Sequence, residues 1–79
     1  MGYTKFGEFM RIKRVKNHEV MADTAKLLGV KLPFISTVER GKRNVPEEWI
    51  PILIEHYNLD IKEQAELLDA VEHSKTQMK

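Results

Sequence analysis

The chain contains no cysteine, and it has few of the residues that mark special structural classes. Its 79 residues include four glycines, three prolines and 8% aromatic residues. Without cysteine the fold cannot depend on disulfides or on thiolate metal ligands, so the simple interpretation is an intracellular protein. No apolar run is long enough to cross a bilayer, and the segment MGYTKFGEFMRIK lacks the apolar centre of a secretion signal. We therefore expect a cytoplasmic location without membrane contact.

The sequence also lacks the patterns of catalytic and metal centres. His18, His56 and His73 are scattered and do not have the spacing of metal ligands. The segment ERGKRN contains Gly-Lys but not the spacing of a phosphate-binding loop. The acidic pairs at 47/48 and 63/66 suit helix dipoles and surfaces better than acid–base catalysis. We expect a protein that is not an enzyme and that needs no cofactor, metal ion or small-molecule ligand.

Charge, in contrast, is divided strongly along the chain. Residues 1–45 hold ten Lys or Arg against four Asp or Glu, a net charge of +6, whereas residues 46–79 hold three against eight, a net of −5. Together they give the overall charge of +1. Such a division favours one face that meets a polyanion and another that does not. The alternative is an ordinary solvated surface on which like charges cluster by chance.

Apolar residues recur at steps of three and four, which predicts an all-α domain. We expect five helices, at about residues 4–15, 20–28, 32–40, 47–57 and from 60 onward, in a single domain spanning 1–79. Its ordered core covers about residues 4–73, followed by a polar tail at 74–79. In the fifth helix, Ile61, Ala65, Leu68 and Val71 are expected to line the inner face, and Asp60 with Glu63 forms a capping box.

Glycine and proline set the predicted helix ends. Gly29 and Gly41 stand where the second and third helices need a left-handed C-terminal residue. Pro33 suits the first turn of the third helix, where a missing N–H is tolerated. Pro51 removes a backbone hydrogen bond near the start of the fourth helix, so we expect that helix to begin late or to be distorted.

Two short helices joined by Gly29-Val30-Lys31 predict a helix-turn-helix formed by helices two and three. The segment ADTAKLLGVKLPFISTVERGKRN resembles the core of the phage-repressor (Cro/XRE-type) helix-turn-helix family. The matching positions are Ala25, Leu28, Gly29, Val30, Ile35, Ser36, Glu39, Gly41 and Arg43. With the flanking helices the similarity covers about residues 5–73, and it implies a compact five-helix, lambda-repressor-like DNA-binding domain. The chain departs from the family pattern at Met21, Thr24 and Lys31.

The resemblance places base readout on the third helix. The side chains that would line the DNA major groove are Lys31, Leu32, Pro33, Ser36 and Thr37. Lys31 can reach a phosphate or a guanine edge, and Thr37 can bond a base or meet a thymine methyl. Two of the set have structural alternatives, since Pro33 can simply start the helix and Leu32 can pack on a neighbour. Phe34 is expected to be a partly buried packing residue.

Further roles follow from the same resemblance. Contacts to DNA phosphates are expected from Met21, Arg40, Lys42, Arg43 and Asn44, and such contacts supply affinity without sequence information. The family pattern pairs the glutamate at Glu39 with an arginine of the first helix, for which Arg14 is the first candidate and Arg11 the second. This ion pair would position the third helix. The alternative is an exposed Glu39 with a weak surface pair.

These features predict a sequence-specific regulator of transcription that binds double-stranded DNA, acting as a repressor in a bacterial or phage setting. Because one small domain binds weakly, we expect a homodimer on a palindromic operator with half-sites ~34 Å apart. Ile52 and Leu67 are the candidate dimer residues, although Ile52 can equally pack between helices four and five. The alternative is an antitoxin-like or accessory module that binds a protein partner through its acidic helices.

Overall fold

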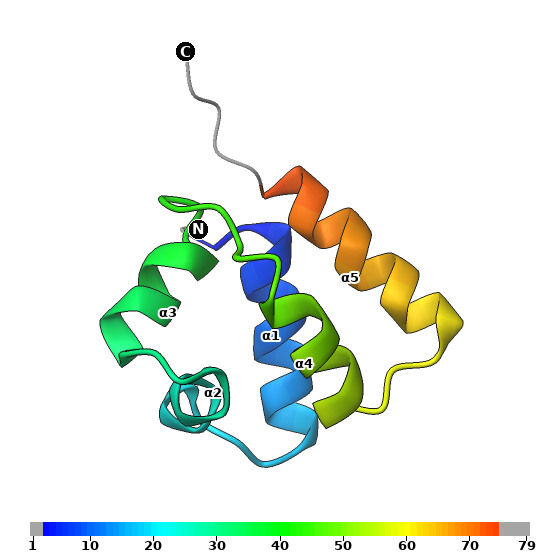
Figure 1. The fold of residues 1–79 in the computed structure, drawn as a ribbon, viewed down its shortest axis with the longest axis horizontal. Coiled ribbons are helices and arrows are strands. Elements are labelled where there is room, and N and C mark those ends of the chain that lie inside the picture. Colours follow the sequence, from blue (N-terminus) through cyan, green and yellow to red (C-terminus); the bar gives the residue numbers. More distant parts are fainter. Residues whose placement is uncertain (1–2, 75–79) are drawn as a thin grey trace.

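The computed structural model describes residues 3–74, and in this range the chain forms five α-helices and no strand (Figure 1). They are α1 (Lys5–Lys16), α2 (Met21–Leu28), α3 (Leu32–Glu39), α4 (Trp49–His56) and α5 (Ile61–His73). The all-α prediction is thus confirmed for these residues. The longest of the described helices, α5, has 13 residues, and none of them has the length and hydropathy needed to cross a membrane.

The helices enclose one hydrophobic core. α1 packs against both α3 and α5. In addition, α2 packs against α3, and α4 packs against α5. In Figure 1, α3 and α5 lie on opposite sides of the molecule. The buried apolar side chains are Phe6, Met10, Ala25, Ile35, Val38, Val45, Trp49, Leu53, Leu59, Leu67 and Ala70. Because every helix contributes at least one of them, no helix is an appendage to the core.

The helix ends follow local chemistry. The Thr4 hydroxyl accepts a hydrogen bond from the Gly7 N–H and caps α1. Gly29 ends α2 with a φ of 70°, the left-handed conformation that glycine adopts without strain. At the start of α5, Asp60 and Glu63 each accept the other's backbone N–H, which is the predicted capping box.

The proline in α4 explains where that helix begins. α4 starts at Trp49 rather than at residue 47, which is the late start anticipated from Pro51. Pro51 is therefore the third helical residue, where a backbone N–H has no partner within the helix in any case. The preceding residues form a turn in which the Trp49 N–H donates to the Pro46 carbonyl.

The predicted inner face of α5 was wrong by about one residue. Ile61 is 85% exposed and Leu68 is 51% exposed, whereas Leu67 is fully buried. Ala65 is exposed too, and only Val71 of the predicted set packs against the core. Both stripes have helical spacing, and the stripe through Leu67 and Ala70 is the one that faces the core. Leu67 therefore has no surface to offer a second copy, which corrects its assignment to a dimer interface.

The ordered region also extends further than expected. Ser74 was assigned to the polar tail, but it is buried and its hydroxyl accepts a hydrogen bond from the Phe6 N–H at 3.0 Å. This contact satisfies one of the free backbone donors in the first turn of α1. The rest of the predicted tail, residues 75–79, lies outside the described residues.

Candidate nucleic-acid interface

The turn between α2 and α3 fixes one side of α3 inward and leaves the other outward. After Gly29, the Val30 N–H donates to the Ala25 carbonyl at 3.0 Å, which folds the turn back on α2. Ile35 and Val38 of α3 are both fully buried. Pro33, Ser36 and Thr37 on the opposite side of α3, and Arg40 at its C-cap, follow helical spacing and keep accessible surface.

The five predicted readout residues all keep solvent-accessible surface. Lys31, Leu32 and Pro33 are exposed at the start of α3, and Ser36 and Thr37 are half-buried. The Thr37 hydroxyl donates to the Pro33 carbonyl at 2.9 Å. With its proton used in this way, Thr37 can accept a hydrogen bond or present its methyl group, but it is not free to donate.

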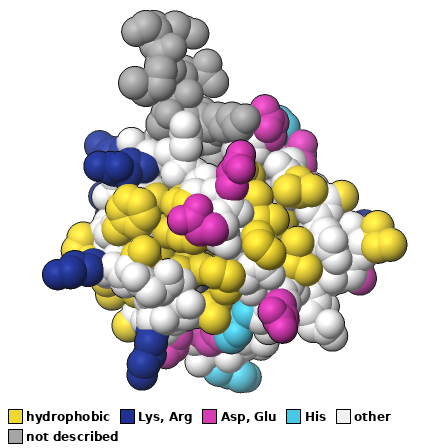
Figure 2. All heavy atoms as spheres, in the orientation of Figure 1, with side chains coloured by type: hydrophobic (Ala, Val, Ile, Leu, Met, Phe, Trp, Pro, Cys, Tyr) yellow, Lys and Arg dark blue, Asp and Glu magenta, His cyan; other side chains and the backbone are white. Residues whose placement is uncertain are grey.

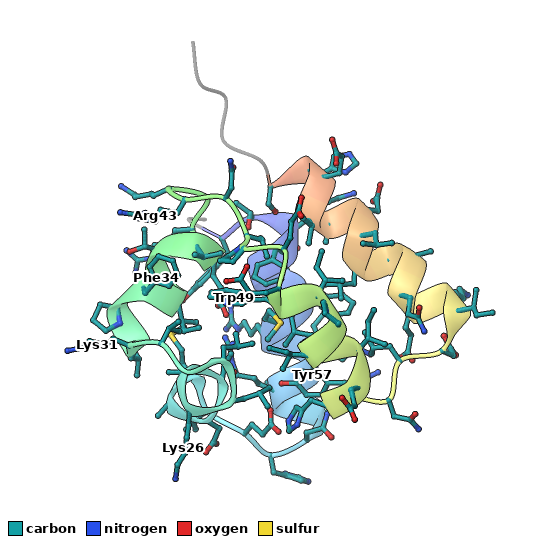
Figure 3. All side chains as sticks on the ribbon, viewed as in Figure 1. Lys26, Lys31, Phe34, Arg43, Trp49 and Tyr57 are labelled. Carbon is teal, nitrogen blue, oxygen red and sulfur yellow. The ribbon has the colours of Figure 1, made fainter. Side chains whose placement is uncertain are left out.

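Basic side chains surround the outward face of α3. We use the name basic edge for Lys26, Lys31, Arg40, Lys42 and Arg43, all of which are exposed. Figure 3 shows Lys26, Lys31 and Arg43 on the same side of the molecule, and Figure 2 shows Lys and Arg side chains along that side. The sequence analysis did not predict Lys26 as a DNA contact. The usable signal was a lysine in the last turn of α2, close to the loop that leads into α3.

The described part of the chain supplies no carboxylate partner to the cations of the basic edge. Among residues 3–74, none of its five members forms an ion pair. Arg43 contacts a ring instead, with its guanidinium carbon 5.6 Å from the centre of Phe34. Positive charge left without a carboxylate partner is available to an external anion.

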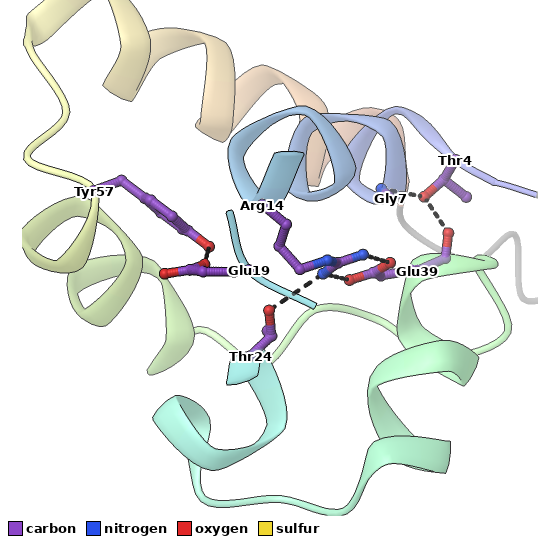
Figure 4. A network of polar contacts seen from close by, with 7 residues as sticks. All are labelled: Thr4, Gly7, Arg14, Glu19, Thr24, Glu39 and Tyr57. Atoms are coloured by element: carbon purple, nitrogen blue, oxygen red, sulfur yellow. Dashed lines mark hydrogen bonds and ion pairs between the residues drawn. The ribbon is translucent and has the colours of Figure 1, made fainter. Parts of the chain in front are cut away.

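An ion pair inside the protein holds α3 in place. The two terminal nitrogens of Arg14 donate to the two carboxylate oxygens of Glu39 at 2.7 and 3.0 Å (Figure 4). Arg14 also donates to the Thr24 hydroxyl at 3.3 Å, so α1, α2 and α3 meet at one guanidinium. The contact between Arg14 and Glu39 expected from the family resemblance is therefore present.

Burial makes this pair structurally important. Glu39 is fully buried and Arg14 is 6% exposed, which excludes the alternative of a weak surface pair. Burial by itself lowers the pKa of Arg14, but the hydrogen bonds and charge of Glu39 outweigh that effect and raise it above its ordinary value. Arg14 therefore stays charged.

A glycine allows α1 to approach the end of α3 closely. The Thr4 N–H and hydroxyl both donate to the Glu39 carbonyl at 3.0 Å. A side chain at Gly7 would place its first carbon 2.5 Å from that same carbonyl oxygen, closer than real contacts allow. The sequence signal for this approach, a glycine within a predicted helix, was not used to predict it.

A second polar contact fixes the connection from α1 to α2. Glu19 accepts a hydrogen bond from the Tyr57 hydroxyl at 2.6 Å, and its other oxygen lies 2.8 Å from Nε2 of His56 (Figure 4 shows the tyrosine contact). Burial, together with the nearby Glu19 carboxylate, raises the pKa of Tyr57 well above its ordinary value. The start of α2 is thereby tied to the end of α4.

Met21 and Asn44, two of the predicted phosphate contacts, differ from the cations of the basic edge. Met21 is half-buried and packs against the core, and its thioether has no proton to donate to a phosphate. Asn44 is exposed, but it also lines a groove between α4 and α5. Within the described residues, no group of three His, Asp or Glu side chains could hold a metal ion.

The predicted dimer residue that remains, Ile52, is half-buried on α4. A groove of about 600 Å³ with a mixed polar and apolar lining lies nearby, between α4 and α5. It is lined by Val45, Ile50, Pro51, Leu68 and Val71, with Asn44, Glu47 and Glu72 as its polar lining residues.

Comparison of the chain with models of known families, with curated proteins and with solved structures finds no match.

Proposed function

We propose that this protein is a sequence-specific regulator of transcription that binds double-stranded DNA, with a lambda-repressor-like fold in which α2 and α3 form a helix-turn-helix. The observation that carries the proposal is the free outward face of α3, bordered by five exposed cations without ion-pair partners among residues 3–74. A major groove is wide enough for one such helix, and its phosphates supply the anions.

The side chains of α3 suggest how sequence would be read. Leu32 and Pro33 offer only apolar contacts, which suit thymine methyl groups, and Thr37 offers a methyl group and a hydrogen-bond acceptor. Arg, Asn and Gln, the residues that make bidentate contacts with bases, are absent from positions 31–37. Part of the specificity would then come from the shape of the DNA.

A homodimer is part of this proposal, because one domain of this size gives weak binding on its own. Its surface is the groove between α4 and α5, whose margin at Asn44 directly follows Arg43 of the basic edge. A second copy docked there would lie beside the first on the same duplex. As a repressor, the dimer would act in the cytoplasm by occupying an operator and blocking polymerase.

The test is a gel shift against genomic fragments and random duplexes over a salt series. The proposal predicts retention of particular fragments and an affinity that falls steeply with salt concentration. Selection of bound sequences from a random pool would then define the operator. Weak binding that is the same for all fragments and changes little with salt would contradict the proposal.

The second candidate is an accessory module that binds a protein. It is favoured by the exposure of Ile61 and Leu68, two large apolar side chains of α5 that do not face the core. Replacing both by Glu separates the two functions. A regulator would retain the affinity of each domain for a half-site, whereas a module would lose its partner in co-purification and would bind no operator at all.

A further inference from the structure

We propose that Phe34 is a positioning residue that holds Arg43 over α3, so that this arginine is oriented toward DNA before DNA binds. The inference rests on the proposed DNA-binding function and adds a role for a residue otherwise expected only to pack. Figure 3 shows Arg43, Phe34 and Trp49 on neighbouring segments, the loop after α3, α3 itself and the start of α4.

A series of ring contacts connects Arg43 to the core. The Arg43 guanidinium carbon lies 5.6 Å from the centre of the Phe34 ring, within the range of a cation–π contact. Phe34 meets Trp49 edge to face, with ring centres 5.8 Å apart and planes at 87°. Trp49 is 2% exposed and lies 6.4 Å from the Phe6 ring. Phe34 therefore contacts the buried Trp49 on one side and the exposed Arg43 on the other.

This contact restrains the arginine without cancelling its charge. In the buried pair, two nitrogens of Arg14 donate to Glu39, so that guanidinium is neutralised and has fewer free donors. A phenyl ring has no net charge, and it attracts the cation through its face. Unlike a carboxylate, it does not occupy the N–H donors of the guanidinium. Arg43 thus keeps its charge and its donors for a phosphate or a base edge.

Restraint before binding should increase affinity. A free arginine side chain loses rotamer freedom when it contacts DNA, and this loss opposes binding. Its neighbour Lys42 has no ring contact among the described residues and would bear that loss in full. Lys42 is also exposed and adjacent in sequence, which makes it the matched control for Arg43.

The experiment is a double-mutant cycle measured by DNA binding across a salt series. Phe34→Leu removes the ring, and we expect it to weaken binding by a factor of about two to five, the size of an exposed cation–π contact, with an unchanged salt slope. Arg43→Ala should weaken binding further and lower the slope by about one. Phe34→Leu should have no additional effect in the Arg43→Ala background, but its full effect in the Lys42→Ala background.

Two further measurements separate positioning from packing. Phe34→Tyr keeps the ring face and should retain wild-type affinity, and all variants are assayed well below their own melting temperatures. In the free protein, the NMR signals of the Arg43 side chain should show a ring-current shift that Phe34→Leu removes and Phe34→Tyr preserves.

The outcomes distinguish failure of the inference from failure of the proposed function. A wild-type protein that retains no duplex would overturn the proposed function, and the role of Arg43 in DNA binding with it. Wild-type binding combined with additive effects of Phe34→Leu and Arg43→Ala would overturn the inference alone. The absence of a ring-current shift in the free protein would do the same.

Discussion

Three basic residues of α1 and the five of the basic edge have opposite electrostatic surroundings. On α1, Lys5 pairs with Asp69 at 3.7 Å, Lys13 with Glu63 at 2.6 Å and Arg14 with Glu39 at 2.7 Å. On the basic edge, no cation has a carboxylate partner among residues 3–74. The positive half of the chain thus contains two kinds of cation, one that joins helices and one that remains available to an external anion.

This difference shows that net charge alone is a poor guide to function. A count over residues 1–45 treats Arg14 and Lys42 alike, although one is buried in a bidentate pair and the other is exposed. What matters for binding a polyanion is the charge that the fold leaves without a partner. The predictions below test whether the two kinds of cation behave differently.

The largest effect is expected at Arg14. Arg14→Met should lower the free energy of unfolding by about 3–5 kcal/mol, because the buried Glu39 carboxylate would lose the one cation that pairs with it among residues 3–74. Chemical denaturation followed by circular dichroism measures this change. Arg11→Met, at an exposed position of the same helix, should stay within about 0.5 kcal/mol of wild type.

A compensating variant then tests what the pair contributes. Arg14→Met combined with Glu39→Leu replaces the pair by apolar side chains, which should recover most of the lost stability. Because this double variant retains the basic edge, it should also retain the salt dependence of DNA binding. An Arg14→Met protein as stable as wild type would show that the buried pair is not a determinant of the fold.

The next effect concerns the unpaired cations. Lys42→Gln should lower the slope of log affinity against log salt by about one, because one phosphate contact is lost. Replacing Lys31, Arg40 and Lys42 together should lower it by about three. Lys5→Gln makes the same change in charge at a paired position and should leave the slope unaltered. Equal slopes for Lys42→Gln and Lys5→Gln would remove the distinction between the two kinds of cation.

How far the sequence predicts this molecule can be judged from particular residues. Helix existence and ends were predictable where one residue decides them, as Gly29, Pro51 and Asp60 do. The rotation of α5 was not, since stripes one residue apart both have helical spacing and only packing against α1 and α4 selects Leu67. Packing also determines that Ser74 is buried against Phe6, a contact between residues 68 apart in sequence.

The candidate site was predictable to a similar extent. The family resemblance supplied the pair of Arg14 and Glu39 and the outward residues of α3. It did not supply the hydrogen bond from Thr37 to Pro33 or the contact of Arg43 with Phe34, since both depend on side-chain conformations. Met21 was assigned by family position although its side chain cannot donate a hydrogen bond.

A smaller effect is expected at Thr37, and it concerns specificity rather than charge. Thr37→Val keeps a methyl group and the side-chain shape but loses the hydroxyl acceptor, whereas Thr37→Ser keeps the hydroxyl and loses the methyl. If Thr37 reads a base, one of the two should change preference at one base pair per half-site, by about 1 kcal/mol or less. Sites selected from a random pool provide the measurement. Selected sites identical to those of wild type for both variants would exclude Thr37 as a reader.

The smallest effect is expected at Glu63, the carboxylate partner of Lys13, and it depends on pH. The hydrogen bond from Lys13, with that from the Asp60 N–H, lowers the pKa of Glu63 below its ordinary value of 4.5. Since the folded pKa lies below the unfolded one, the stabilising contribution is complete above about pH 5 and is lost as the pH falls through the folded pKa. Wild type should therefore melt above Glu63→Gln at neutral pH, and the difference should shrink as the solution is acidified.

Glu66→Gln is the matched control for this last test, because Glu66 lies on the same helix and forms no ion pair within the part of the chain that is described. Its melting temperature relative to wild type should change less with pH. Lys13→Met should abolish most of the pH dependence seen between wild type and Glu63→Gln, because it removes the donor that lowers the pKa of Glu63. If Glu63→Gln and wild type differ equally at every pH, the cations of α1 do not act through their carboxylate partners, and the contrast with the basic edge loses its physical basis.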